Sequence, residues 1–369
     1  MWLKEMKYLV AYILPFLVLM GFWLLGYWTF LGLIFIFFLV PILELFFPGT
    51  TENHSKDEEK ERRKQKIFDW LLYLNVPLQY TLLISFLWVI SQHTLATYEL
   101  VGCVLSMGLT CSALGINVAH ELGHRSKKSE RFLSKALLLT SLNLHFFIEH
   151  NRGHHRFVAT DEDPASSKYG QNLYAYLMQS PIRQYFSAWD IENSTRKRRG
   201  LKVWSLKNEM IQFQLIQLAF LAIIGLIFGL KAVVCFFIAA MLGILLLDVV
   251  NYVEHYGLRR KEISPGRYET VGPHHSWNSN QALGRIILYD LTRHSDHHFK
   301  ASRKYQVLRH LEEAPQLPTG YPGMVLLALI PPIWFKVMNP RVENWCRTYG
   351  YPIKTKKSTI TSSMSPLSS

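Results

Sequence analysis

Cysteine is scarce in this chain of 369 residues, which contains only four of them. Cys103, Cys111 and Cys235 fall inside long apolar stretches, where a free thiol behaves as a small hydrophobic side chain. Cys346 stands alone, and no Cys-x-x-Cys pair occurs in the sequence. The sequence therefore excludes a zinc ribbon or a cysteine-bound iron–sulfur cluster in this chain. Any electrons that it uses must come from a separate protein.

Charged residues are also scarce, at 18% of the chain against 49% hydrophobic residues. They are nearly absent from six stretches, at about 8–25, 28–47, 68–90, 98–118, 210–229 and 231–253. About 20 apolar residues cross the hydrocarbon core of a bilayer, and a helix satisfies its own backbone groups there. The first stretch has no small-residue cleavage site, and a second follows at once, so it is not a signal peptide. The sequence predicts an all-α integral membrane protein with six transmembrane helices, rather than a soluble protein with buried core helices.

The basic residues are unevenly distributed between the connections. Lysine and arginine gather in the loop 50–66 and around residues 196–199, whereas the connections near Gly26, 92–97 and Lys231 have almost none. Cytoplasmic loops carry the excess of lysine and arginine. We therefore expect both termini, the loop 50–66 and the segment 119–208 to face the cytoplasm. The formal charge of +13 follows largely from this bias, and it also suits docking of an acidic protein partner. No nucleic-acid recognition motif accompanies the basic runs, so no nucleic-acid partner is expected.

The chain is predicted to form one membrane-embedded domain over residues 1–345. The apolar stretch Val325–Phe335 is too short and too rich in proline to cross a membrane, so we expect it to pack against the rest or to lie at the interface. Residues 346–369 end in a run rich in serine, threonine and lysine that predicts a disordered tail. We find no internal repeat of 20–50 residues.

Nine histidines fall into four clusters that follow the apolar stretches. The clusters are His120-Glu-Leu-Gly-His124, His150-Asn-Arg-Gly-His154-His155, Glu254-His255 and His294-Ser-Asp-His297-His298. Neutral imidazole binds iron, zinc, copper and nickel well. One zinc ion takes three or four ligands, so nine histidines suit two metal ions and are too many for one.

The spacing inside each cluster is that of a helix. Residues i and i+4, or i and i+3, share a helix face, so His120 and His124 are expected to point the same way. The same spacing relates His150 to His154, and it relates His294 to both His297 and His298. His255 adds a ninth ligand from the end of the sixth span. We therefore expect a His-rich catalytic unit at the cytoplasmic ends of the spans.

A carboxylate stands beside the histidines of each cluster: Glu121, Glu149, Glu254 and Asp296. Metal-bound histidine usually donates its second N–H to a carboxylate or a carbonyl, which fixes the tautomer. We predict this supporting role for the four acids, with ordinary solvated carboxylates and direct metal ligation by one of them as the alternatives.

An all-imidazole site beside a membrane suits oxidative chemistry. Neutral ligands leave iron with high positive charge, which favours activation of O2, and an apolar substrate could enter sideways from the bilayer. Ionisable groups at membrane depth are costly and are by default functional. Attack on an unactivated C–H bond is the chemistry that justifies such a site.

Several stretches carry a resemblance to a known family. They are Asn117-Val-Ala-His-Glu-Leu-Gly-His124, Glu149-His-Asn-Arg-Gly-His-His155 running into Val158-Ala-Thr-Asp-Glu-Asp-Pro164, Asn251-Tyr-Val-Glu-His-Tyr-Gly-Leu258 and Arg293-His-Ser-Asp-His-His298. With them, the chain resembles the membrane-bound alkane monooxygenase (alkane hydroxylase) family over about residues 60–345. Arg125, Arg156-Phe157 and Asp161 depart from the commoner residues of that family, but none of them is a histidine of the clusters.

The resemblance implies a six-helix enzyme of the bacterial inner membrane with two non-haem iron ions. It would insert one atom of O2 into the terminal methyl of an alkane, giving a 1-alkanol. Two electrons would come from rubredoxin, a separate acidic protein that is reduced by its own reductase. The iron ligands carried over are His120, His124, His150, His154, His155, His255, His294, His297 and His298.

Three other functions remain open from the sequence. A fatty-acyl desaturase or hydroxylase of the wider His-rich di-iron superfamily would share the metal and the membrane. A membrane zinc metalloprotease would use His120-Glu121-x-x-His124, with the glutamate as general base, but it leaves the other histidines unexplained. A metal or haem transporter would place its clusters near the middle of the membrane.

Overall fold

The computed structural model describes residues 5–353, and this part of the chain contains six helices that are long and apolar enough to cross a membrane. They cover Met6–Leu24, Gly26–Glu44, Ile67–Gln92, Thr97–Gly123, Glu209–Phe228 and Leu230–His255. The prediction of an all-α protein with six spans is confirmed, with helix ends that differ by a few residues. The protein is therefore an integral membrane protein.

Most spans are built from more than one helical segment. The first is η1 (Met6–Tyr12) and α2 (Ile13–Leu24), and the second is η2 (Gly26–Phe30), α3 (Leu31–Ile34), η3 (Phe35–Leu39) and α4 (Val40–Glu44). The third is α6 (Ile67–Tyr73) and α7 (Asn75–Gln92), and the fourth is α8 (Thr97–Thr110), η4 (Cys111–Ile116) and α9 (Asn117–Gly123). The last two are single helices, α15 (Glu209–Phe228) and α16 (Leu230–His255). Because α9 continues to Gly123, His120 lies inside the fourth span, whereas the sequence pattern had placed it just beyond residue 118.

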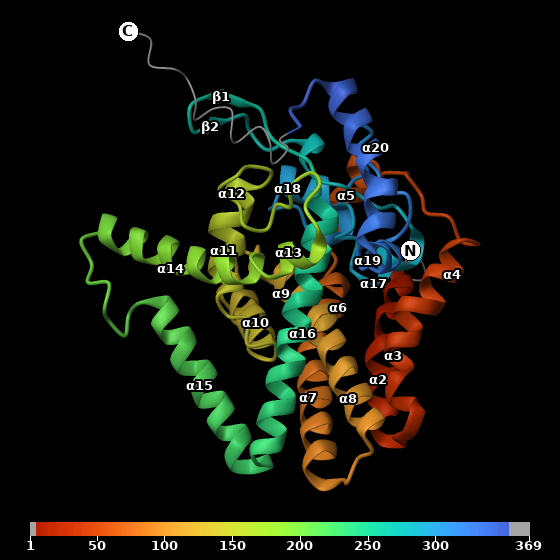
Figure 1. The fold of residues 1–369 in the computed structure, drawn as a ribbon, viewed down its shortest axis with the longest axis vertical. Helices are drawn as coiled ribbons and strands as arrows, with labels where there is room; N and C mark the ends of the chain where they lie inside the picture. Colours follow the sequence, from red (N-terminus) through yellow and green to blue (C-terminus); the bar gives the residue numbers. More distant parts are fainter. Residues whose placement is uncertain (1–4, 354–369) are drawn as a thin grey trace.

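Two glycines let the fourth span, through α8 and η4, and the sixth span, α16, approach each other closely. A Cβ atom on Gly243 would lie 2.6 Å from the Cβ of Cys111, and one on Gly108 would lie 2.9 Å from the Cβ of Leu242. Small residues at a helix–helix contact allow this kind of backbone approach in membranes. The contact aligns the fourth and sixth spans, which carry His120 and His255 at the same end of the bundle (Figure 1).

The remaining elements gather at that histidine-bearing end of the spans (Figure 1). They are α5 (Lys56–Lys64), α10 (Lys128–Leu139), α11 (Phe146–Glu149), η5 (His150–His154), α12 (His155–Phe157), α13 (Leu173–Leu177), α14 (Ser180–Arg198), α17 (Ala282–Ile287), α18 (His294–Phe299) and η7 (Tyr305–Val307). A small antiparallel hairpin of β1 (Glu262–Ser264) and β2 (Arg267–Tyr268) precedes η6 (Pro273–His275). In Figure 1, α14 runs across the direction of the spans and leads down into α15.

The C-terminal part ends in two helices, α19 (Tyr321–Ala328) and α20 (Pro331–Tyr349). The two helices meet near the prolines of the stretch Val325–Phe335. This stretch is not among the six spans. It packs inside the protein through buried residues such as Val325 and Trp334. Helix α20 continues to Tyr349, past the boundary that we expected at residue 345, because Val342 and Cys346 on its inner face are buried. The rest of the predicted tail, residues 354–369, lies outside the described residues.

Candidate metal centre

The nine histidines of the four clusters lie together at the ends of the spans, and their ring nitrogens form two groups. The first group contains His120, His124, His150, His155 and His297, and the second contains His154, His255, His294 and His298. Within each group, one ligand atom from every residue lies within 4.8 Å of the others. The two groups can therefore each hold a metal ion.

Within each group the Nε2 atoms of several histidines lie about one ligand-to-ligand distance apart. In the first group, Nε2 of His297 is 2.8 Å from that of His120 and 3.2 Å from that of His155. In the second, Nε2 of His298 is 2.9 Å from that of His294 and 3.2 Å from that of His154. A metal holds imidazole nitrogens at about 2.0–2.1 Å, so adjacent nitrogens around one ion stand roughly 3 Å apart. The donor sets fit metal ions at both positions.

The second cluster divides between the two groups because its helix is wider than an α-helix. Residues His150–His154 form a π-helical turn, η5, in which residues five apart fall on the same side. His150 therefore shares the first group with His155, at 3.0 Å between Nε2 atoms, and His154 turns to the second group. The α-helical spacing had placed His150 and His154 on one face; their rings are neighbours, with centroids 5.2 Å apart, although their nitrogens fall in different groups.

Helix α18 also supplies both groups. His294 and His298, one α-helical turn apart, point into the second group, and His297 points into the first. As expected from the spacing, all three rings lie in the cluster of nine histidines, with centroids 4.4–5.8 Å apart, but they divide between its two groups. Two segments therefore contribute histidines to both groups. One is η5 together with α12, and the other is α18.

Burial keeps the histidines available as neutral ligands. It lowers the pKa of His124 to about 3, and it lowers the pKa of His150, His155 and His298 well below the ordinary value of histidine. In each case the neighbouring rings add to this effect, because a second positive charge close by would be unfavourable. Neutral imidazole is the form that binds metal.

The other ring nitrogen of His154 has a carboxylate partner that sequence reasoning missed. Its Nδ1 lies 2.9 Å from Oδ2 of Asp163, and the Asp163 side chain is fully buried. Burial alone would raise the pKa of this carboxyl group, but the His154 ring and the Ser166 hydroxyl outweigh it and lower the pKa. Asp163 stands nine residues after His154 in the stretch Val158–Pro164, so no helical spacing pointed to it.

The four carboxylates predicted to support the histidines have other roles in most cases. Glu121 binds the Arg125 guanidinium at 2.6 Å and accepts the backbone N–H of Tyr305 at 3.2 Å. Asp296 pairs with Arg303 and accepts the backbone N–H of Arg309. These two acids hold the segments around the site together. The geometry also weakens the protease alternative, because Glu121 is committed to Arg125 and cannot serve as a free general base.

Glu149 and Glu254 behave differently from those two. Burial, aided by the nearby Asp163 and Asp248 carboxylates, raises the pKa of Glu149 well above its ordinary value, which favours its neutral form. Oε2 of Glu254 lies 3.3 Å from Nε2 of His294, the nitrogen that faces the second group. Among the four, Glu254 is the acid in a position suited to a metal ion.

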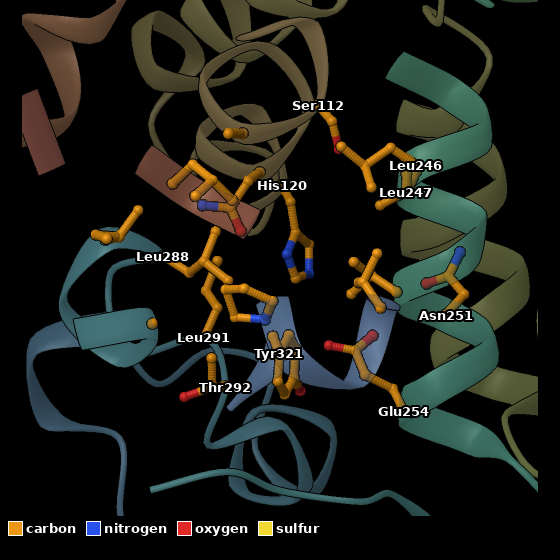
Figure 2. A pocket seen from close by; sticks show the side chains of 18 of the residues that line it. Ser112, His120, Leu246, Leu247, Asn251, Glu254, Leu288, Leu291, Thr292 and Tyr321 are labelled. Atoms are coloured by element: carbon orange, nitrogen blue, oxygen red, sulfur yellow. The ribbon is translucent and has the colours of Figure 1, made fainter. Parts of the chain in front are cut away.

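A cavity with largely apolar walls opens onto both groups. His120 and His150 of the first group and His294 of the second line it, together with Glu254 and Asn251 of α16. Figure 2 shows His120 and Glu254 facing the same space as Leu246, Leu247, Leu288, Leu291 and Tyr321. The walls come from the second, fourth and sixth spans and from α17 and α19, so the cavity joins the site to the membrane-embedded part of the protein.

Histidines outside the four clusters stay outside the two groups. His145 meets Tyr185 edge to face, with ring centroids 5.2 Å apart, and His275 contacts Glu269 at 3.1 Å. Ser276, next to His275, lies 3.4 Å from Nδ1 of His255. The segment 274–276 thus touches the site through Ser276 and the backbone of His275, and not through its histidine side chains.

Comparison with known proteins identifies the families whose sequences this chain resembles. A family model described as fatty acid desaturase matches residues 96–328, which include all nine histidines. An alkane 1-monooxygenase of Pseudomonas putida is 38% identical over 348 residues, which cover 93% of this chain and 86% of that protein. Alkane 1-monooxygenase 2 of Pseudomonas aeruginosa is 40% identical over 320 residues, covering 86% and 84% of the two chains. The hydroxylase component of xylene/toluene monooxygenase from Pseudomonas putida is 28% identical over 341 residues, covering 90% and 88%.

Proposed function

Because the chain belongs to the fatty acid desaturase family and, within it, to the alkane monooxygenases, we propose that it hydroxylates the terminal methyl group of an alkane. The reaction consumes R–CH3, O2, two protons and two electrons, and it yields R–CH2OH and water. The observation that carries the proposal is the apolar cavity that opens onto histidines of both groups.

The proposed cofactor is a pair of non-haem iron ions held by the nine histidines. Two bound iron ions would supply the activation of O2 that attack on an unactivated C–H bond requires. The five nitrogens of the first group and the four of the second, each set within 4.8 Å, support this assignment. Asp163 would hold the His154 ring in the tautomer that leaves Nε2 free for the metal.

The cavity residues bind and orient the substrate in this proposal. Leu246, Leu288 and Val325 give the chain of an alkane an apolar lining, and burial there removes it from water. The end of the cavity at His120, His150 and His294 would receive the terminal methyl group. Glu254 is the carboxylate beside that end, and it can hold a proton or approach a metal there.

Products from the iron-loaded protein in membranes test the proposal. The protein would receive a rubredoxin, its reductase, NADH, 18O2 and a mixture of linear alkanes, with analysis by gas chromatography and mass spectrometry. We expect 1-alkanols with one 18O atom. The variant His150→Ala should lose the product. The matched control is His54→Ala, because His54 lies in the loop before α5, and this variant should still form the product.

A fatty-acyl desaturase is the second candidate, since the matching family model carries that description. It would give an alkene from a saturated acyl chain and no labelled alcohol. Methylbenzenes belong in the same assay, because one relative is named a xylene/toluene monooxygenase component. Labelled benzyl alcohols without 1-alkanols would replace the alkane by an alkylbenzene as the substrate.

The electron donor in this proposal is a separate, acidic protein of the rubredoxin type. The described cysteines are four free, buried thiols, which offer no iron–sulfur site in this chain. The net charge of +13 supports an encounter with an acidic partner. If turnover with rubredoxin is no faster than with reductase alone, the partner assignment is wrong while the hydroxylation can still stand.

We also propose that the histidine-bearing end faces the cytoplasm of a bacterial inner membrane. The basic loop 50–66 and the run 196–199 support this orientation. Single cysteines placed at exposed Lys60 and at exposed Thr97 should react from opposite sides of sealed inverted and right-side-out vesicles. Labelling of both from one side would contradict the orientation.

A further inference from the structure

The outer face of α13 and α14 carries a row of exposed apolar side chains. Tyr174, Met178, Ile182 and Phe186 follow one another at intervals of four residues, and they are 53%, 74%, 57% and 59% exposed. Ile182 and Phe186, four apart, lie on one face of α14, while Tyr174 belongs to α13 and Met178 follows the end of α13. Exposed apolar rows of this kind mark binding sites for a partner or a membrane.

The opposite face of α14 is fixed to the helices that carry the metal centre. Gln184 donates to the Asp248 carboxylate of α16 at 2.5 Å, and Ser180 lies 3.1 Å from the same carboxylate. Farther along, Glu192 pairs with Arg152 of η5 at 3.2 Å. The apolar row therefore has a fixed direction relative to the bundle and points away from it.

The loop 199–208 after α14 gathers positive charge. The buried Arg196 donates to the backbone carbonyls of Lys202 and Lys207, which folds the loop back against the end of the helix. Lys197, Arg198, Arg199, Lys202 and Lys207 are all exposed in this region. Within the described residues, none of these five forms an ion pair with a carboxylate.

Aromatic and aliphatic side chains stand among these charges. Trp204 is 84% exposed and Leu206 is 72% exposed. Tryptophan and tyrosine favour the boundary between headgroups and acyl chains, and Trp204 and Tyr174 lie at the two ends of this surface. The loop then leads directly into α15, a span whose side chains are mostly exposed to the surroundings of the bundle.

The position in the fold matches a membrane boundary. Figure 1 shows α14 running across the spans at the height where α15 begins, so the helix lies parallel to the plane that the spans cross. An amphipathic helix in this position, rich in basic residues, binds the surface of a bilayer that contains anionic lipids. From these observations we propose that α13, α14 and the loop 199–208 form an in-plane anchor that inserts its apolar row into one leaflet and binds the headgroups of anionic phospholipids.

This proposal goes beyond the proposed function, and its test does not depend on turnover. The test uses the full-length protein in nanodiscs, with Phe186→Cys carrying an environment-sensitive fluorophore. The four described cysteines are buried, so the new thiol is the reactive one. Nitroxide-labelled phosphatidylcholine or phosphatidylglycerol is added, and quenching of the fluorophore is measured.

We expect quenching by both lipids, with phosphatidylglycerol markedly more effective. Removing positive charge with Arg198→Gln, Arg199→Gln and Lys202→Gln should lower that preference about fivefold or more, as expected when basic residues near a lipid surface are removed. The matched control removes three exposed charges elsewhere, with Lys127→Gln, Lys128→Gln and Arg267→Gln, and should keep the preference.

Two results would overturn the proposal. Equal quenching by the two lipids in the parent protein would show that the surface does not recognise anionic headgroups. Absence of quenching by either lipid, together with energy transfer between labelled copies, would make the row an interface between two copies of the chain.

Discussion

Asp163 illustrates how one residue can orient a proposed metal ligand, His154, from outside the recognisable motifs. Its carboxylate faces Nδ1 of His154 and also accepts the Ser166 hydroxyl at 2.5 Å and the backbone N–H of Ala165 at 3.1 Å. These donors hold the carboxylate in place and favour its ionised form. The His154 proton is then kept on Nδ1, and Nε2 points to the second histidine group.

Replacement of Asp163 by asparagine should weaken metal retention without preventing membrane insertion. Loss of such a supporting carboxylate typically costs about 10- to 100-fold in metal affinity. Iron remaining after a chelator challenge, measured by elemental analysis, checks the prediction. Glu162→Gln is the control, because Glu162 is the exposed neighbouring acid and should keep its iron. Equal iron retention in the two variants would remove Asp163 from the metal site.

At the scale of elements, the three π-helical segments of the described chain all reach the cavity. Ile36 and Phe37 of η3, Ser112 and Ala113 of η4 and His150 of η5 line its wall. A π-helical turn takes up one extra residue within a helix and often stands at a functional site. In η4, this turn lies between the regular helix α8 and the histidines of α9.

Two single-residue deletions in the fourth span should separate these roles. Deleting Ala113 removes the extra residue of the wide turn, so His120 should keep its direction and the protein should keep its iron. Deleting Val118, in the regular helix α9, rotates His120 by about 100° relative to the span and should abolish iron binding by the first group. Iron per chain and monodispersity of the purified protein are the measurements. Similar iron loss in both deletions would mean that η4 itself sets the direction of His120.

The close contact between the fourth span (α8 and η4) and α16 is a second feature at this scale. A side chain on Gly243 has no room, since its Cβ would meet Cys111 at 2.6 Å. Gly225 of α15 is also in a span, but its Cβ would meet only Val233, at 3.4 Å. The two glycines therefore provide a matched pair.

Gly243→Val should destabilise the protein by about 1–3 kcal/mol, the usual cost of overpacking a well-packed contact. Gly225→Val should change the stability little. The measurement is the melting temperature of each purified variant, obtained by size-exclusion chromatography of samples heated to increasing temperatures. A melting temperature for Gly243→Val equal to that of the parent would show that α16 can move away from α8 freely.

At the scale of the whole molecule, the proposed metal centre depends on segments far apart in the chain. The first group draws on α9, η5, α12 and α18, and the second draws on η5, α16 and α18. The two groups share η5 and α18 but differ in their spans, since α9 ends the fourth and α16 ends the sixth. They should therefore be separable by mutation.

His124→Ala should remove iron from the first group and leave the second occupied, and His255→Ala should do the reverse. Each variant is expected to retain about half of the iron of the parent, as follows when one of two separately held ions is lost. Elemental analysis with Mössbauer spectroscopy on 57Fe-loaded protein distinguishes the two remaining sites. Complete iron loss in both variants would show that the two groups bind metal only as one unit.

Local patterns in the amino-acid sequence are sufficient to predict a six-span membrane protein with a metal-binding cluster of histidines. Long apolar stretches at a length of about 20 residues predict spans because the bilayer leaves no water for the backbone. The nine histidines predict metal binding because few other roles require so many imidazoles at helical spacing. These are local properties, so they can be identified without knowing which segments meet.

The grouping of the histidines and the identity of their supporting acid follow from the packing of the fold. His150 pairs with His155 and not with His154, because η5 is a π-helix whose wider turn no sequence spacing announced. Asp163 reaches His154, while Glu121 and Asp296 bind arginines instead. These partners are set by the packing of α9, η5, α16 and α18 against one another. Such contacts depend on distances across the fold, which the order of residues along the chain does not specify.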